Sequence, residues 1–256
     1  DWNETCKMIT DVIGKAIQHA SIVVTQGFIG GTSENFTTTL GREGSDFTAA
    51  ILAHCLKAES VTIWKDVPGV LNADPKYFND TQLIPEISYF DAMELAYFGT
   101  SVIHPKTVKP LQNAGIPLYV RSFLQPKESG TVVSGSAATS TVPNFIVKKE
   151  QALVSISPRD HSFVAENHFI EIFSLLHQLR IKTNVMQNSA ISFSFCTDYN
   201  EAKIAELRTL LSTRFDLLYN KDCELITIRH FNDATIDRLV AGRAVLLEQR
   251  TRTSAQ

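Results

Sequence analysis

A glycine-bracketed loop that leads directly into an amphipathic helix constrains this chain more than any other feature. After three threonines the sequence runs Leu40-Gly41-Arg42-Glu43-Gly44-Ser45-Asp46, and apolar residues then recur at helical spacing. The glycines allow tight or left-handed backbone angles, and Ser45 or Asp46 is placed to cap the helix. A helix N-terminus favours an anion, and Arg42 can hold a carboxylate or phosphate through two parallel hydrogen bonds. The residues alone predict either a small-anion site or an ordinary capped turn with a surface arginine.

Around this loop the apolar pattern alternates between strands and helices. Short apolar runs predict strands over residues 21–25, 60–64, 117–123 and 131–134. Helical spacing predicts helices over 3–20, 46–57 and 88–98, and a shorter one after His104-Pro105. Such alternation is typical of an α/β fold, with a mostly parallel sheet covered by helices.

The pattern changes after a small, polar stretch at residues 135–143, which predicts a linker. Beyond it, strands and helices follow in the order β-α-β-β-α-β, which is the ferredoxin-like motif. A last helix near 235–241 is compatible with the start of a second such unit. We therefore expect two domains, residues 1–143 and 144–256.

Charge and cysteine content exclude several classes of protein. The 256 residues include 24 basic and 27 acidic side chains, a formal charge of -3 without long runs of one sign, so neither a nucleic-acid nor a membrane partner is expected. No apolar run approaches the roughly 20 residues of a membrane span, and no signal peptide opens the chain. The cysteines lie far apart in sequence, which favours free thiols in the cytoplasm over a disulfide frame or a zinc site. They are Cys6, Cys55, Cys196 and Cys223.

Five motifs in fixed order resemble the aspartokinases of the amino-acid-kinase superfamily, which phosphorylate the side-chain carboxylate of aspartate. They are Gln26-Gly27-Phe28-Ile29-Gly30, Thr38-Thr39-Leu40-Gly41-Arg42-Glu43-Gly44-Ser45-Asp46, Trp64-Lys65-Asp66-Val67-Pro68-Gly69-Val70, Ala73-Asp74-Pro75, and Phe98-Gly99 with Val102-Ile103-His104-Pro105. The part from about Leu153 resembles the regulatory ACT domains of the same family, which have the same β-α-β-β-α-β order.

The resemblance implies L-aspartate and ATP as substrates, Mg²⁺ as cofactor and 4-phospho-L-aspartate as product, at the first step of lysine, threonine and methionine biosynthesis. It implies that Arg42 grips the α-carboxylate of aspartate and that Asp46 organises the catalytic site. No metal-binding side chain is assigned. The remaining substrate-binding positions would be Phe28, Glu43, Gly44 and Ser45. The nucleotide-binding positions would be Lys65, Asp66, Leu71, Lys76 and Ser101.

The chain also departs from the family pattern. The family's Lys-Phe-Gly-Gly segment and an upstream substrate-binding acid are not present, so we expect this chain alone to be inactive or nearly so. Ser101 stands where many members have lysine, and Lys106 or Lys109 is a candidate replacement. His104 is expected to be structural, because a carboxylate acceptor needs no base. The alternatives are a non-catalytic regulatory and dimerisation fragment, or a glutamate- or uridylate-kinase-like member of the superfamily.

For the ACT region the resemblance implies feedback control by an amino acid, lysine first and threonine next, in a homodimer paired through these domains. Candidate effector contacts are Asn184, Asn188 and Ser189, since amide and hydroxyl groups can bind an amino acid's ammonium and carboxylate. The alternative is that these residues only form turns in a dimer interface.

Overall fold

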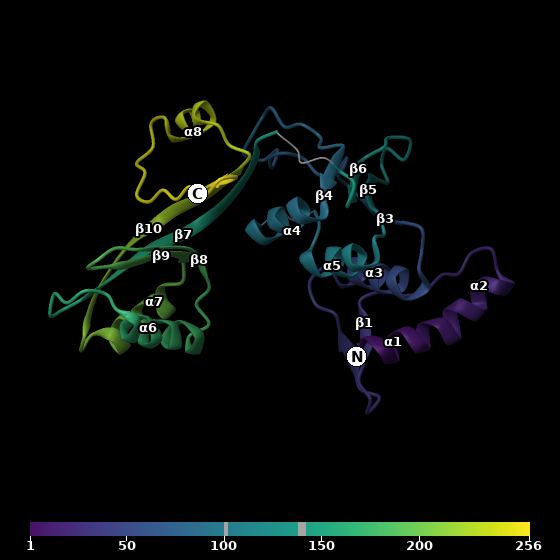
Figure 1. The fold of residues 1–256 in the computed structure, drawn as a ribbon, viewed down its shortest axis with the longest axis horizontal. Coiled ribbons are helices and arrows are strands. Elements are labelled where there is room, and N and C mark those ends of the chain that lie inside the picture. The colour runs from purple at the N-terminus through teal and green to yellow at the C-terminus, as the bar shows by residue number, and fades with distance from the viewer. Residues whose placement is uncertain (100–101, 138–141) are drawn as a thin grey trace. The chain divides into compact units, whose positions relative to one another are not determined.

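The computed structural model describes residues 1–99, 102–137 and 142–256. The chain forms two compact units, Asp1–Val142 and Pro143–Gln256 (Figure 1). Within the described ranges no helix is both long and apolar enough to cross a membrane.

The first unit contains a four-stranded sheet in the order β3-β5-β6-β4. Two of its three strand pairs are parallel, and only β5 and β6 run antiparallel. Helix α3 packs near β3, while α4 packs on β4 and β6 and α5 packs on α3. The predicted α/β class with a mostly parallel sheet is confirmed. The bounds are β3 Val61–Lys65, β4 Glu86–Ser88, β5 Leu118–Ser122, β6 Thr131–Ser134, α3 Gly44–Leu56, α4 Tyr89–Phe98 and α5 Pro105–Ala114.

Local capping signals fix two of these helices. The Ser88 hydroxyl accepts from the Asp91 backbone N–H at 3.0 Å, and Gly99 ends α4 as predicted. The Nδ1 atom of His104 accepts from the Lys106 N–H at 3.1 Å and so caps α5. The prediction of a structural histidine is confirmed.

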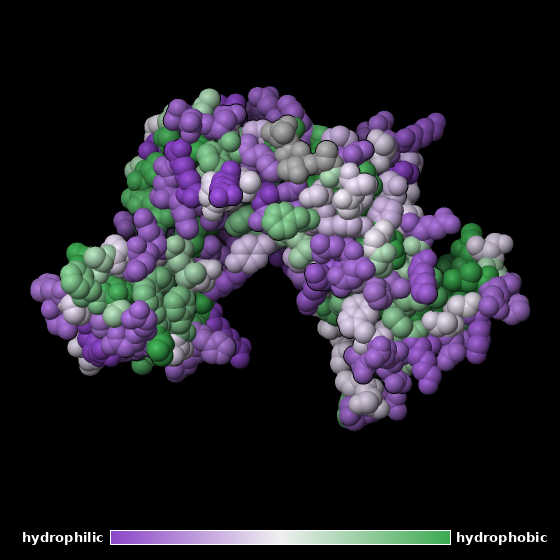
Figure 2. Space-filling view, viewed as in Figure 1, coloured by the Kyte–Doolittle hydropathy of each residue, from purple (hydrophilic) through white to green (hydrophobic). Residues whose placement is uncertain are grey.

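The N-terminal arm is a helix of three pieces: α1 (Trp2–Ile9), one π-helical turn at Thr10–Gly14, and α2 (Lys15–His19). None of their residues is buried. The strand predicted over 21–25 is wrong, because this segment has no neighbouring strand to pair with. Ile22 and Val24 are 81% and 90% exposed there, and Figure 2 shows hydrophobic surface beyond the end of α2. A short antiparallel hairpin follows instead, β1 (Ile29–Gly31) with β2 (Thr37–Thr39).

The cysteines also correct the sequence analysis. Cys6 of α1 and Cys55 of α3 form a disulfide, with Cα atoms 4.8 Å apart. They are 49 positions apart in the chain, but α1 packs along α3 and brings them together. Cys196 and Cys223 are free thiols, as predicted.

The second unit has an antiparallel sheet in the order β11-β10-β7-β9-β8. The elements follow as β7 (Asn144–Pro158), α6 (Glu166–Gln178), β8 (Thr183–Asn188), β9 (Phe193–Asp198), α7 (Glu201–Leu211) and β10 (Phe215–Arg229). This order and strand arrangement confirm the predicted ferredoxin-like motif. β10 is one strand of 15 residues, with register shifts against β7 between Asn220 and Cys223 and between Cys223 and Leu225. Asn200 caps α7 by accepting from the Lys203 N–H at 3.0 Å.

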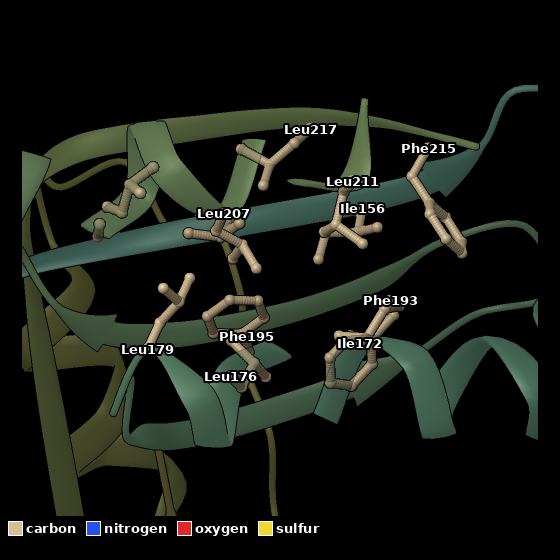
Figure 3. Close-up of a cluster of buried hydrophobic side chains, with 13 residues drawn as sticks. Ile156, Ile172, Leu176, Leu179, Phe193, Phe195, Leu207, Leu211, Phe215 and Leu217 are labelled. Carbon is tan, nitrogen blue, oxygen red and sulfur yellow. The ribbon is translucent and has the colours of Figure 1, made fainter. Parts of the chain in front are cut away.

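One hydrophobic core lies between this sheet and helices α6 and α7 (Figure 3). Residues of alternate strand positions face the helices, so the intervening positions face the opposite side. The side chains of this cluster are Ala152, Val154, Ile156, Ile172, Leu176, Leu179, Phe193, Phe195, Ile204, Leu207, Leu211, Phe215 and Leu217.

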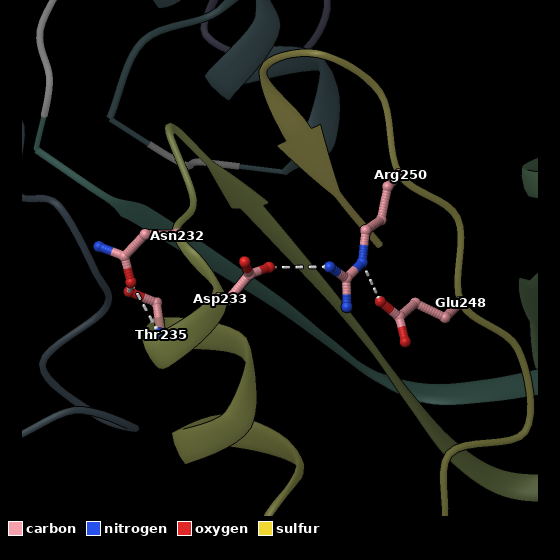
Figure 4. Close-up of polar contacts among 5 residues, drawn as sticks. All are labelled: Asn232, Asp233, Thr235, Glu248 and Arg250. Atoms are coloured by element: carbon pink, nitrogen blue, oxygen red, sulfur yellow. Dashed lines mark hydrogen bonds and ion pairs between the residues drawn. The ribbon is translucent and has the colours of Figure 1, made fainter.

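The C-terminal part consists of α8 (Asp233–Val240) and the short strand β11 (Ser254–Ala255) on the edge of β10. The Asn232 side chain caps α8 by accepting from the Thr235 N–H at 2.8 Å. Arg250 donates to Asp233 at 3.0 Å and to Glu248, and thereby ties the last segment to the start of α8 (Figure 4).

Candidate functional site

The loop before α3 has two residues with left-handed backbone angles, on either side of Arg42. Gly41 has a φ of +78°, and Glu43 has a φ of +54° although it is not glycine. The Gly44 N–H donates to the Gly41 carbonyl at 3.0 Å and closes the turn. The helix begins at Gly44, with Glu43 in the cap position and without a side-chain cap. Capping by Ser45 or Asp46 was therefore wrong, since both already lie in the first helical turn, where free N–H groups face outward.

Phe28 packs against this loop. Its N–H donates to the Thr48 hydroxyl at 3.0 Å, and its carbonyl accepts from the Leu40 N–H at 2.8 Å. A Cβ added to Gly44 would lie 2.8 Å from Phe28 Cδ2, so the ring rests directly on the glycine. Phe28 is 42% exposed, so part of its ring remains available as a wall.

An ion pair joins the start of α3 to the end of β3. Lys65 Nζ lies 2.9 Å from Asp46 Oδ2, and each side chain is only 19% exposed. Two residues 19 positions apart, expected in different sub-sites, thus share one contact. Because each charge is neutralised by the other, neither is free to repel a ligand at the helix N-terminus.

Two further ionisable side chains of the loop have no such partner. Arg42 is exposed, and no described side chain forms an ion pair with it. Glu43 has a side-chain oxygen, Oε2, that is buried without a hydrogen-bond partner among the described residues. A buried acceptor that is not satisfied is costly, and a ligand donor would remove that cost. Ser45 is exposed beside them.

Thr131, which is fully buried, hydrogen-bonds to the turn that follows β3. Its hydroxyl accepts from the Val70 N–H at 2.8 Å and donates to the Ile84 carbonyl at 2.6 Å. Gly69 has a φ of +150°, and a Cβ there would lie 2.6 Å from the threonine oxygen. This packing fixes the turn that carries Asp66, whose side chain is exposed.

The structure places the other predicted nucleotide positions separately. Leu71 is half-buried and bridges to Leu83. Lys76 is exposed on a turn in which its N–H donates to Asp74 Oδ1 at 2.8 Å. No hydrogen bond or ion pair among the described residues connects either one with the loop at α3, and Ser101 lies outside the described residues. The alternative lysines, Lys106 and Lys109, are both exposed on α5.

Thr48 and Thr131 are supporting residues that sequence reasoning missed. Thr48 accepts from the Phe28 N–H and donates to the Gly44 carbonyl at 2.9 Å, so it ties the ring to the helix start. A threonine in the second helical turn commonly donates to a carbonyl four residues earlier, as Thr48 does to Gly44. Its bond with Phe28, 20 positions away, cannot be predicted from the sequence.

In the second unit Asn184 belongs to a closed polar network. Its Nδ2 donates to Gln151 Oε1 at 2.8 Å and to Asp198 Oδ1 at 3.1 Å, while its Oδ1 accepts from Lys148 Nζ at 3.1 Å. Hydrogen bonds from Gln151 and Asn184 lower the pKa of the Asp198 carboxyl. Burial lowers the pKa of Lys148, and burial raises the pKa of the neighbouring Cys196 thiol to about 11.

Asn188 and Ser189 lie at the other end of β8 and are exposed. The Ser189 hydroxyl meets the Ser192 hydroxyl at 2.8 Å and accepts from the Ser192 N–H at 3.1 Å. Asn188 lies four positions after Asn184 along the strand, a distance of roughly 13 Å. A free amino acid of ordinary size reaches one of these groups more readily than both.

The described residues contain no group of three or more His, Cys, Asp or Glu side chains arranged to hold a metal ion. Mg²⁺ in phosphoryl-transfer sites commonly uses one or two carboxylates together with substrate phosphates and water. The carboxylates at this site, Asp46 and Asp66, therefore fit a cation that arrives with a nucleotide, but not a preformed protein cage.

Comparison with known proteins identifies the family of the chain. Residues 4–122 match the model of the amino acid kinase family. Lysine-sensitive aspartokinase 3 of Escherichia coli is 37% identical over 182 residues, which cover 69% of this chain and 39% of that protein. Aspartokinase 1, chloroplastic, of Arabidopsis thaliana is 30% identical over 191 residues, 73% of this chain and 33% of that protein. The chain thus spans well under half of these relatives.

Solved structures of aspartate kinases are similar to this chain over its full length. E. coli aspartokinase III in complex with aspartate and ADP has a TM-score of 0.78 at 25% identity, covering 100% of this chain and 60% of that one. The aspartate kinase of Clostridium acetobutylicum has a TM-score of 0.84 at 18% identity, covering 100% and 62%, which shows a shared fold. From the family match, the identities and the fold together, this chain belongs to the aspartokinases of the amino acid kinase family.

Proposed function

We propose that this chain contains the aspartate-binding loop and the regulatory region of an aspartate kinase. Residues 1–143 form the carboxy-terminal portion of the kinase domain, and 144–256 form the ACT-type region. The enzyme transfers the γ-phosphoryl group of MgATP to the side-chain carboxylate of L-aspartate, giving 4-phospho-L-aspartate at the first step of lysine, threonine and methionine biosynthesis. The observation that carries this proposal is the loop at the start of α3, where Arg42 is exposed and Glu43 has an unpaired buried oxygen.

The loop suits a zwitterion. Arg42 binds the α-carboxylate through its planar fork, together with the free N–H groups of the first turn of α3. Glu43 accepts from the ammonium group, which satisfies its buried oxygen. Phe28 forms the wall, and Ser45 is an exposed donor at the same edge. The E. coli relative that was solved with aspartate and ADP supports both ligands.

The chemistry asks mainly for positioning. A side-chain carboxylate oxygen of aspartate forms a bond to the γ-phosphorus, the bond from phosphorus to the bridging oxygen breaks, and ADP leaves. The acceptor is already ionised, so no base is required. Mg²⁺, bound with the nucleotide, neutralises phosphate charge. The Lys65–Asp46 pair holds the helix start against the end of β3. Lys65 and Asp66 are the nucleotide contacts proposed there, and Leu71, Lys76 and Ser101 are further proposed nucleotide contacts.

Calorimetric titration of L-aspartate into the chain tests this proposal. Charge-assisted hydrogen bonds contribute about 1.5–3 kcal/mol each, so Arg42→Ala should weaken binding about tenfold or more. Arg252→Ala, another exposed arginine, is the matched control and should leave the affinity unchanged. Succinate, which lacks the ammonium group, should bind weakly and should respond little to Glu43→Gln. Equal affinity in the wild type and Arg42→Ala would place the pocket elsewhere.

A second candidate is a regulatory and dimerisation fragment without turnover, which the ferredoxin-like sheet of the second unit supports. Coupled measurement of ADP production with aspartate and MgATP separates the two, and we expect little or no turnover by this chain alone. The lysine-sensitive relative supports lysine as the effector, with threonine next. Asn188 and Ser189 are the proposed contacts, with Asn184 positioned by its network. Titration with each amino acid, and sedimentation for the proposed homodimer, test these points.

A further inference from the structure

The Cys6–Cys55 disulfide is a covalent link between α1 and α3, and α1 packs on α3 without burying any of its own residues. None of the residues of α1, the π-turn or α2 is buried, and Met8, Val12 and Ile17 are 61%, 68% and 51% exposed. The non-covalent attachment includes an edge-to-face contact between Trp2 and His54, with ring centroids 5.1 Å apart. Such limited packing stabilises a helix weakly in water.

The disulfide also closes a covalent loop of the chain, residues 6–55, which contains the candidate site. Starting from Cys6, the chain passes through the arm and the irregular segment 20–27, forms the loop with Phe28 and Arg42, and continues along α3 to Cys55. The site lies at one end of α3 and the disulfide at its other end. One anchor of the segment that leads into Phe28 is therefore the disulfide, and the other is the Thr48 hydroxyl.

Both cysteines are half-buried rather than fully buried. We propose that Cys6–Cys55 is a reversible thiol–disulfide site that fastens the N-terminal arm to α3 and releases it on reduction. A thiolate of a dithiol reductant attacks one sulfur and forms a mixed disulfide, while the other cysteine leaves as a thiolate and takes up a proton. The second thiol of the reductant then displaces the remaining cysteine. Two electrons pass to the protein, and the reductant leaves as a disulfide.

The chain is to be compared as isolated without added thiol reagents and after reduction with dithiothreitol. Alkylation under denaturing conditions, followed by mass spectrometry, should modify two of the four cysteines in the isolated sample and all four in the reduced one. Amide hydrogen exchange in residues 1–19 should accelerate about tenfold or more on reduction, while the core of the second unit should not change.

Matched variants separate the arm from general effects of the reagents. Cys6→Ser and Cys55→Ser should each exchange like the reduced protein in either buffer. The double variant Cys196→Ser with Cys223→Ser should keep the full redox response. Alkylation of all four cysteines in the isolated sample, or identical exchange of residues 1–19 in both states, would overturn the proposal. These readouts require no aspartate, so they stand apart from the test of the proposed function.

Discussion

The contact between Gly44 and Phe28 allows a sharp test of how the site is built. Gly44→Ala places a methyl carbon 2.8 Å from Phe28 Cδ2 and 3.1 Å from Leu40 Cβ. Optimal carbon–carbon separations are about 3.5–4.0 Å, so the ring has to move. Phe28 cannot shift freely, since both its N–H and its carbonyl are hydrogen-bonded. The added methyl therefore displaces the wall of the proposed aspartate pocket.

The expected stability change follows from two opposing terms. Overpacking costs roughly 1–3 kcal/mol, and replacing glycine by alanine in a helix returns up to about 1 kcal/mol. The net effect of Gly44→Ala should be a destabilisation of about 1–2 kcal/mol. At Gly14, also in a helical conformation, an added Cβ would meet only Thr10 and Leu56 atoms at 3.6 and 3.8 Å, which is ordinary contact. Gly14→Ala should therefore be neutral or stabilising.

Urea unfolding followed by tryptophan fluorescence measures this difference in the relevant unit. The chain has two tryptophans, Trp2 and Trp64, and both belong to the first unit. Titration with L-aspartate should also show weaker binding for Gly44→Ala but not for Gly14→Ala. If Gly44→Ala were as stable as Gly14→Ala and bound aspartate normally, the ring would not rest on the glycine as described.

Three further predictions concern single contacts. Leu217 is only 6% exposed, so Leu217→Ala should lower the free energy of unfolding of the second unit by about 2–5 kcal/mol. Leu218 on the same strand is 72% exposed, so Leu218→Ala should change it little. Hydrogen exchange in β7 and β9 measures both effects. The pKa of the Asp198 carboxyl is lowered in the folded state. Its ionised form therefore stabilises the fold above the unfolded pKa of about 3.9, and this stabilisation is lost as the pH falls through the folded pKa. Asp198→Asn should make the free energy of unfolding depend less on pH, as measured by unfolding curves between pH 6 and 2. Lys65→Met leaves Asp46 unpaired and should weaken aspartate binding several-fold in calorimetry, with Lys57→Met on the exposed end of α3 as control.

The elements that sequence predicted correctly are those specified by local chemistry. Ser88 and Gly99 bound α4 because a cap and a left-handed stop act within a few residues of their own backbone. His104 caps α5 for the same reason. The strand predicted at 21–25 failed because apolar, β-branched residues make a strand only where a partner strand is available. Sequence alone gives the propensity but not the partner.

In the candidate site, too, the features that were predicted are local in the sequence, and those that were missed join distant segments. The glycine-arginine loop and the helix it opens are contiguous, so their residues could be assigned from the sequence. The Lys65–Asp46 pair, the Thr48 link to Phe28 and the Cys6–Cys55 bond all join distant segments. Composition even argued against the disulfide, since cysteines without close spacing usually remain free. Only the packing of α1 on α3 makes that bond possible.

The arrangement of charged side chains at the loop favours an amino acid over a simple anion as the ligand. Asp46 and Lys65 neutralise each other at 2.9 Å, which leaves Arg42 and Glu43 as the charges without an ion-pair partner among the described side chains. A phosphate or chloride would satisfy Arg42 and the helix N-terminus but would be repelled by the buried oxygen of Glu43. A zwitterionic α-amino acid satisfies both, since its ammonium nitrogen and carboxylate carbon are separated by only two bonds. Glu43 also adopts a left-handed conformation that glycine would adopt at lower cost, and binding of the proposed ligand would offset that cost.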